Sequence, residues 1–137
     1  LPLADLITPN VQEASVLSKI SVESIEDAVN AAYILRQKGA QGILMKGGHF
    51  DGDELVDLLF QGDDPPERLT GSRIDTRNTH GTGCTLASAC AIGLAQGLSL
   101  KAAVQRAHAY VRTAIKTAPG FGSGHGPLNH GLTVKLF

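Results

Sequence analysis

Four residues, Gly81-Thr82-Gly83-Cys84, stand directly before a stretch with helical spacing and could bind a phosphoryl group. Glycines let the backbone come close to a ligand, and the first N–H groups of a helix have no partner inside the helix. The helix dipole adds positive potential at the same point, which would suit an anion and favour the thiolate of Cys84. A plain glycine-rich turn, with Cys84 as a small buried residue, explains the same pattern equally well.

A second candidate site lies at Asn10 and Glu13, three positions apart at the expected start of a helix over about residues 11–17. Side chains at that spacing can face the same side. Their oxygens could hold Mg²⁺, usually through water, because this ion keeps much of its hydration shell. The same pair also fits a capping box, with Asn10 at the N-cap and Glu13 at the third helical position. Considered alone, the pair favours the capping box.

Lys46 is a third candidate, because it ends an apolar stretch and precedes Gly47, Gly48 and His49. A lysine at the carboxyl end of a strand, next to two flexible glycines, could reach a nucleotide phosphate. A solvated lysine before a turn is the simpler interpretation when the segment is considered alone. The five histidines lack the spacing of a metal site, and residues 121–127 fit either a flap over a ligand or an ordinary loop.

The elements that must position these residues follow from hydrophobic spacing and from turn residues. Helices are predicted over about 11–17, from Ser24 to a stop at Gly39, over about 82–96, and from Ser99 to a stop at Pro119. Strands are predicted over 5–8, 42–46, 54–60, 67–75 and the chain's last residues, with a turn over 61–66. A helix between two apolar strands is typical of a parallel sheet. Ligands bind outside the carboxyl ends of such strands, so residues 8–10, 46–49 and 75–84 should converge there.

Composition narrows the class of protein. The chain has 137 residues, 42% of them hydrophobic, and its 12 basic and 13 acidic residues nearly cancel. Without a basic stripe, nucleic acid is not expected as a partner, and without an apolar run of ~20 residues neither is a membrane. Cys84 and Cys90 would lie on different faces of one helix, which favours reduced thiols in a cytoplasmic protein.

The candidate segments occur together, in the same order, in a known family. The matching stretches are Leu6-Ile7-Thr8-Pro9-Asn10-x-x-Glu13-Ala14, Lys46-Gly47-Gly48-His49, Arg73-Ile74-x-Thr76-x-Asn78-Thr79-His80-Gly81-Thr82-Gly83-Cys84-Thr85 and Gly124-His125-Gly126-Pro127-Leu128-Asn129-His130. With these stretches the chain resembles the hydroxymethylpyrimidine/phosphomethylpyrimidine kinases of thiamine biosynthesis. The resemblance implies a ribokinase-like three-layer α/β/α fold with a mainly parallel sheet. It also implies ATP, Mg²⁺ and two successive phosphorylations of 4-amino-5-hydroxymethyl-2-methylpyrimidine.

The resemblance implies roles for the matched residues as well. Cys84 would be the base that activates the substrate, at the position where many ribokinase-like sugar kinases carry an aspartate. Gly81, Thr82 and Gly83 would form the anion hole for the transferred phosphoryl group. The nucleotide and its Mg²⁺ would be held by four other matched residues: Asn10 and Glu13 of the clan's NxxE motif, Lys46 at the ATP phosphates, and Thr76 near the nucleotide.

The family's chains are considerably longer than this one. We therefore expect residues 1–137 to be the C-terminal half of a single kinase domain, a fragment or truncated gene product with little activity alone. The family resemblance suggests a homo-oligomer for the full-length protein. Two alternatives are a pyridoxal or pyridoxine kinase of the same clan, and a catalytically inactive module that binds a nucleotide or a pyrimidine.

Overall fold

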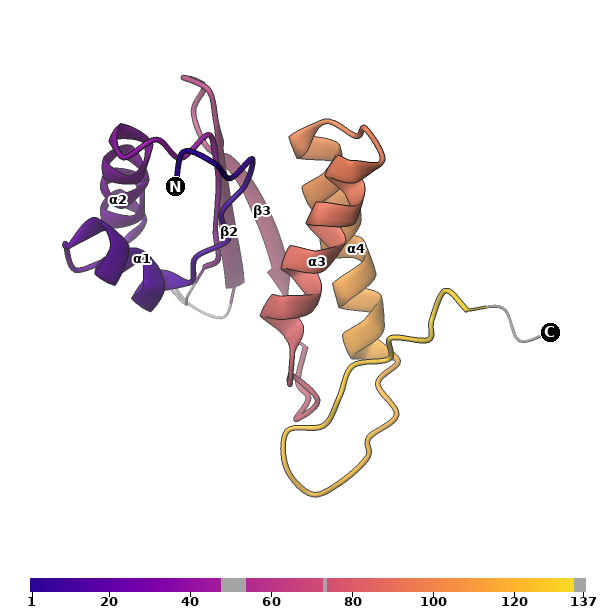
Figure 1. Cartoon of the computed structure of the whole chain (residues 1–137). Coiled ribbons are helices and arrows are strands. Elements are labelled where there is room, and N and C mark those ends of the chain that lie inside the picture. Colours follow the sequence, from indigo (N-terminus) through magenta and orange to yellow (C-terminus); the bar gives the residue numbers. More distant parts are fainter. Residues whose placement is uncertain (48–53, 73, 135–137) are drawn as a thin grey trace. The chain divides into compact units, whose positions relative to one another are not determined.

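The computed structural model describes residues 1–47, 54–72 and 74–134, and the chain forms two compact units, Leu1–Arg73 and Ile74–Phe137. The first unit contains α1 (Val11–Ser18), α2 (Ile25–Gln37), β1 (Gly42–Met45), β2 (Glu54–Gln61) and β3 (Glu67–Ser72). The second contains α3 (Thr82–Ala95) and α4 (Leu100–Lys116) (Figure 1). Gly48, His49 and Arg73 of the matched segments lie outside the described residues.

The sheet of the first unit has the order β1-β2-β3, and both neighbouring pairs are antiparallel. Only residues 46–53 separate β1 from β2, too few for the crossover that a parallel pair needs. Parallel pairing occurs on the other side of β1, where bridges join Ile7 to Ile43 and Asn10 to Lys46. The strand predicted over 5–8 is therefore reduced to a parallel bridge at Ile7, with a second bridge beyond it at Asn10.

A buried central strand, β1, positions Lys46, the third candidate. All four residues of β1 are buried, as expected for a strand with neighbours on both edges and side chains packed on both faces. Ala28, Ala31 and Ala32 of α2 belong to the same core as Ile43 and Met45. Lys46 follows directly after this strand, so its backbone is attached to the most rigid part of the unit.

Local signals at its first turn explain where α2 begins. The Ser24 hydroxyl accepts a hydrogen bond from the Asp27 N–H at 3.1 Å, and the Asp27 carboxylate accepts one from the Ser24 N–H at 3.0 Å. The side-chain hydrogen bond with Ser24, followed by the backbone N–H groups, lowers the pKa of Asp27. These capping residues lie three positions apart, so the helix start can be predicted from the local sequence. The predicted helix from Ser24 to a stop at Gly39 is confirmed, since α2 spans Ile25–Gln37 with Ser24 as its N-cap.

The second unit is a helical hairpin followed by a loop. Leu86, Cys90 and Gly93 are the buried residues of α3, and those of α4 are Ala103, Val104, Ala107, Val111 and Ala114. A Cβ on Gly93 would lie 2.7 Å from the Cβ of Ala103, so glycine permits the two helices to approach closely. Residues 128–134 contain turns and no strand, so the predicted terminal strand is absent from the described part of that segment. No helix in the described ranges has both the length and the apolar character for crossing a membrane.

Candidate functional site

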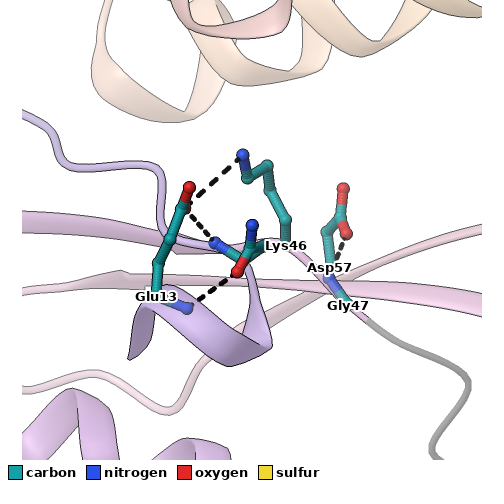
Figure 2. A network of polar contacts seen from close by, with 5 residues as sticks. Glu13, Lys46, Gly47 and Asp57 are labelled. Carbon is teal, nitrogen blue, oxygen red and sulfur yellow. Dashed lines mark hydrogen bonds and ion pairs between the residues drawn. The ribbon is translucent and has the colours of Figure 1, made fainter. Parts of the chain in front are cut away.

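Asn10 and Glu13 form a capping box at the start of α1. The Asn10 Oδ1 accepts the Glu13 N–H at 2.8 Å, and the Glu13 Oε2 accepts the Asn10 N–H at 2.8 Å (Figure 2). The capping interpretation is therefore confirmed. The capping hydrogen bonds leave both side chains able to bind a further group, because an amide oxygen and a carboxylate each accept more than one hydrogen bond. Glu13 can thus hold the helix start and still face a further cation.

Lys46 lies beside this capping box. Its backbone N–H donates to the Pro9 carbonyl at 2.8 Å, and its Nζ lies 4.0 Å from the Glu13 Oε2. That separation is longer than a hydrogen bond, and ion pairs of this kind contribute only about 0–1 kcal/mol. The structure thus brings Asn10, Glu13 and Lys46 together, with the ammonium near a carboxylate and not locked to it.

Asp57 joins the same network, although the sequence analysis did not single it out. Its Oδ1 accepts the Gly47 N–H at 2.5 Å, at the end of β1 (Figure 2). The available signal was a lone charged residue in the apolar stretch Leu55–Phe60. Its significance depends on the pairing register of β1 with β2, and this register cannot be read from residue types alone.

The turn before α3 has the geometry expected of an anion-binding helix start. Gly81 is the N-cap residue, with φ 80° and ψ 7°, and no side chain caps the helix. This left-handed backbone conformation favours glycine at position 81. The Thr82 N–H donates to the Thr79 carbonyl at 3.3 Å. The absence of a side-chain cap leaves the N–H groups of Gly83 and Cys84 for another acceptor. Cys84, in the first turn, is exposed, so the interpretation of Cys84 as a small buried residue is wrong.

Cys90 is the buried cysteine of this helix. It is 1% exposed, and burial raises the pKa of its thiol to about 11. A neutral thiol of this kind behaves as a small apolar side chain. Neither cysteine is in a disulfide, as the sequence predicted.

A cleft of about 900 Å³ opens beside the α3 turn within the second unit. It is lined by residues of α3, α4 and the final segment, among them His80, Gly81, Cys84, Tyr110, Pro127 and His130. The Tyr110 hydroxyl donates to the His130 carbonyl at 3.2 Å. The exposed thiol of Cys84 therefore faces a space large enough for a small molecule.

The segment that leads into α3 is held by the glycine-rich loop. The His80 N–H donates to the Gly126 carbonyl at 3.2 Å, and His80 and Pro127 form a parallel bridge. A Cβ on Gly126 would lie 2.1 Å from the Asn78 Oδ1. Thr76 belongs to the same segment, where its hydroxyl accepts the Asn78 N–H at 3.1 Å. The loop thus packs against the approach to the α3 turn.

The predicted site residues fall into two groups. Asn10, Glu13 and Lys46 belong to the first unit, whereas Thr76 and residues 81–84 belong to the second. Among the residues that the structure describes, no three His, Cys, Asp or Glu side chains are grouped to hold a metal ion. The donor set of Asn10 and Glu13 fits Mg²⁺ only if water or phosphate oxygens complete its coordination, which is common for this ion.

Comparison with solved structures defines the class of fold. A pyridoxal kinase from Staphylococcus aureus in complex with AMP-PCP matches with a TM-score of 0.88 and 39% identity, over 98% of this chain and 50% of that chain. A phosphomethylpyrimidine kinase from Clostridium difficile matches with a TM-score of 0.66 and 33% identity, over 83% of this chain and 44% of that chain. The fold is therefore that of the ribokinase-like α/β kinases.

Sequence comparison identifies the family. The profile described as phosphomethylpyrimidine kinase matches residues 1–129, and the chain belongs to this family. A hydroxymethylpyrimidine/phosphomethylpyrimidine kinase of Rhizobium meliloti is 47% identical over 134 residues, 95% of this chain and 50% of the relative. A thiamine biosynthesis bifunctional protein of Geobacter sulfurreducens is 46% identical over 134 residues, 98% of this chain and 27% of the relative. The chain thus spans half of the first relative and about a quarter of the second.

Proposed function

We propose that the chain is the C-terminal half of a single ribokinase-like domain that phosphorylates 4-amino-5-hydroxymethyl-2-methylpyrimidine and then its monophosphate with ATP. The family match over residues 1–129 carries the proposal, because it includes both groups of candidate site residues. The composition of α3 supports a larger domain, since the helix has no charged residue. Surface helices normally carry charged residues on their solvent face, so a helix without any is expected to be covered on more than one side.

In the proposed reaction, the α3 turn would neutralise charge on the transferred phosphoryl group, and Lys46 would contact the phosphates of ATP. Helix N–H groups and a lysine are suited to this task, because phosphoryl transfer is catalysed mainly by positioning and electrostatic stabilisation. The Cys84 thiolate would accept the proton of the substrate hydroxyl as its oxygen attacks the γ-phosphorus and ADP leaves. A base of this kind contributes about 10²–10⁴-fold, an addition to the electrostatic effect.

Mg²⁺ would shield the phosphate charges of ATP in the proposed site. Glu13 supplies a carboxylate next to Lys46, and Asn10 supplies an amide oxygen at the same helix start. Both would act on the ion through water, because their capping hydrogen bonds hold them at the start of α1. Thr76 would lie near the nucleotide as part of the segment before α3.

A second candidate function is phosphorylation of pyridoxal. It is favoured by the higher structural similarity to pyridoxal kinases, including one from Staphylococcus aureus in complex with AMP-PCP and pyridoxal, with a TM-score of 0.88. Both substrates are flat rings that carry a hydroxymethyl group. In the proposed domain, much of the surface that would select between the pyrimidine and pyridoxal would lie in the other half. The phosphate-binding residues of this chain therefore do not distinguish the two substrates.

The test is a steady-state assay of the longer protein that contains this chain, with ATP and either the pyrimidine or pyridoxal. We expect a kcat/KM for the pyrimidine at least ~10-fold above that for pyridoxal, because a site built to hydrogen-bond its substrate discriminates strongly. The reverse ratio would establish the second candidate function. Nucleotide binding without turnover of either compound would contradict both and indicate an inactive binding module.

We also propose that the complete protein is a homo-oligomer of the cytoplasm. The two free cysteines agree with a reducing compartment. Light scattering coupled to size-exclusion chromatography of the complete protein tests the oligomer, and a monomeric mass at micromolar concentration would contradict it.

A further inference from the structure

We propose that Asp57 is a positioning residue that fixes the backbone at Gly47, so that Lys46 is presented to the phosphates of a bound nucleotide. This inference deepens the proposed kinase function and rests on it. Asp57 would not touch the reacting atoms. It would act through Lys46, the neighbour of the residue it binds.

The first observation is the position of the carboxylate. β1 and β2 are paired with Met45 opposite Leu58, and continuing that register places Lys46 opposite Asp57 and Gly47 opposite Val56. The Gly47 N–H donates to the Asp57 Oδ1 at 2.5 Å, at the point where β1 has ended. A charge-assisted hydrogen bond of this length is stronger than one between neutral groups, so it holds the chain where the strand ladder no longer does.

The second observation is the absence of space at Gly47. A Cβ at this position would lie 1.6 Å from the carbonyl oxygen of Val56 and 2.5 Å from its carbonyl carbon. The backbone of Gly47 therefore lies directly against the backbone of β2. This close approach brings its N–H within reach of Asp57, and any other residue would force the two strands apart.

The third observation is that Lys46 is held from both sides. Its own N–H donates to the Pro9 carbonyl at 2.8 Å, and the next N–H along the chain donates to Asp57. The two successive N–H groups thus bind opposite neighbours of β1. The Cα of Lys46 is fixed between these anchors, while its four-carbon side chain is free to adjust to a ligand.

The arrangement of charges completes the argument. Glu13 and Asp57 lie on either side of Lys46, and the three side chains project in the same direction (Figure 2). The Nζ of Lys46 is 4.0 Å from the Glu13 Oε2, beyond hydrogen-bond distance. The ammonium is thus not held in a tight ion pair with Glu13, and no such pair has to break when a phosphate binds.

The experiment uses the longer protein that contains this chain and compares Asp57→Ala, Asp57→Asn and Lys46→Ala. We expect Asp57→Ala to raise KM for ATP about tenfold, as loss of a hydrogen bond to a charged group does, with kcat changed less than about threefold. Asp57→Asn keeps an acceptor oxygen and should recover most of the affinity. Asp63→Asn is the matched control, because Asp63 is an exposed carboxylate in the turn after β2 and its 2.8 Å ion pair is with Arg36 of α2, not with Lys46 or Gly47.

A double-mutant cycle separates positioning from a general effect on folding. If Asp57 acts through Lys46, the Lys46→Ala/Asp57→Ala double variant should bind ATP no more weakly than Lys46→Ala alone. Additive losses would overturn the proposal. So would an unchanged KM for ATP in Asp57→Ala, or an equal rise in KM for both substrates together with a lowered melting temperature.

The failure of the proposed function would be recognised separately. If the unmodified protein turns over neither substrate, calorimetric Kd values for AMP-PCP in the same variants replace KM. The expected tenfold weakening in Asp57→Ala, absent in the Asp63→Asn control, would then support the positioning role in a binding protein. A protein that binds no AMP-PCP would overturn both proposals.

Discussion

Cys84 and Cys90 differ in accessibility although they belong to one helix. Cys84 is exposed, whereas Cys90 is 1% exposed and has a thiol pKa raised to about 11 by burial. Because the thiolate is the reactive form, only Cys84 should be alkylated by iodoacetamide at pH 8 in the native protein. Mass spectrometry of peptides from residues 1–137 should find one modification, none in Cys84→Ser, and two after unfolding in urea. Rapid modification of Cys90 in the folded protein would contradict the burial of α3 against α4.

The raised pKa of Cys90 also predicts a dependence of stability on pH. In the unfolded chain the thiol ionises near pH ~8.5, whereas in the folded protein it stays protonated up to about pH 11. Stability from the protonated thiol is therefore complete below ~8.5 and is lost as pH rises through this window, by at most about 1.4 kcal/mol per pH unit. Urea unfolding at pH 8 and pH 10 measures the loss. Cys90→Ala is the control, and an equal loss in this variant would contradict the assignment.

The proposed base gives a prediction for activity at the residue scale. Cys84→Ala in the longer protein should lower kcat by about 10²–10⁴-fold and leave KM for ATP within a few fold, because the base acts mainly in the transition state. Cys90→Ala is the matched control: it removes a thiol from the same helix, away from the exposed first turn. A full rate in Cys84→Ala would remove the base role while leaving the α3 turn as a candidate anion site.

At the scale of elements, the close approach of α3 and α4 should be sensitive to one methyl group. In Gly93→Ala the new Cβ would lie 2.7 Å from the Cβ of Ala103 and 3.0 Å from its Cα. Overpacking of this kind costs about 1–3 kcal/mol, more than the ~1 kcal/mol that alanine contributes through helix propensity. Urea unfolding should show the net loss. Ala103→Gly should restore part of it in the double variant, and a more stable Gly93→Ala protein would contradict the packing.

Helix ends were predictable because their causes are local. Ser24 and Ser99 are N-caps as expected, and α1 begins after Asn10, as the capping pattern indicated. Strand pairing was predictable only in part. The parallel bridge of Ile7 with Ile43 agrees with the expected strand–helix–strand pattern, whereas the register of β1 with β2 depends on which residues meet across the sheet. The sequence predicted a terminal strand from residue types alone, and residues 128–134, the described part of that segment, contain turns and no strand.

The candidate site was also predictable where its causes are local, and not where it depends on contacts between distant residues. Glycines before α3 and the Asn10–Glu13 spacing are local patterns, so their geometry agrees with the expectation. The contact of Asp57 with Gly47 joins residues of two strands, and it follows from the pairing register. Residue types could not separate a capping box from a magnesium site at Asn10 and Glu13 either, because the same oxygens suit both.

The whole molecule gives the last prediction, which concerns the 137-residue chain by itself. The relatives named as hydroxymethylpyrimidine/phosphomethylpyrimidine kinases are about twice as long, since the chain covers 48–50% of those from Bacillus subtilis and Rhizobium meliloti. Phosphoryl transfer depends on the exact distance between nucleotide, acceptor and base, and misplacement by ~1 Å can cost ~10²-fold. If the chain is half of a domain, as we propose, it lacks the surfaces that would hold the acceptor.

We therefore expect the isolated chain to turn over the pyrimidine at least ~100-fold more slowly than the longer protein at equal concentration. Addition of the separately expressed N-terminal half should restore part of the rate if both halves fold, because association supplies the missing surfaces. The same mixture with Cys84→Ala in this chain should stay inactive, which assigns the restored rate to the complemented site. A normal rate from the isolated chain would show that residues 1–137 contain the complete catalytic machinery and would overturn the half-domain proposal.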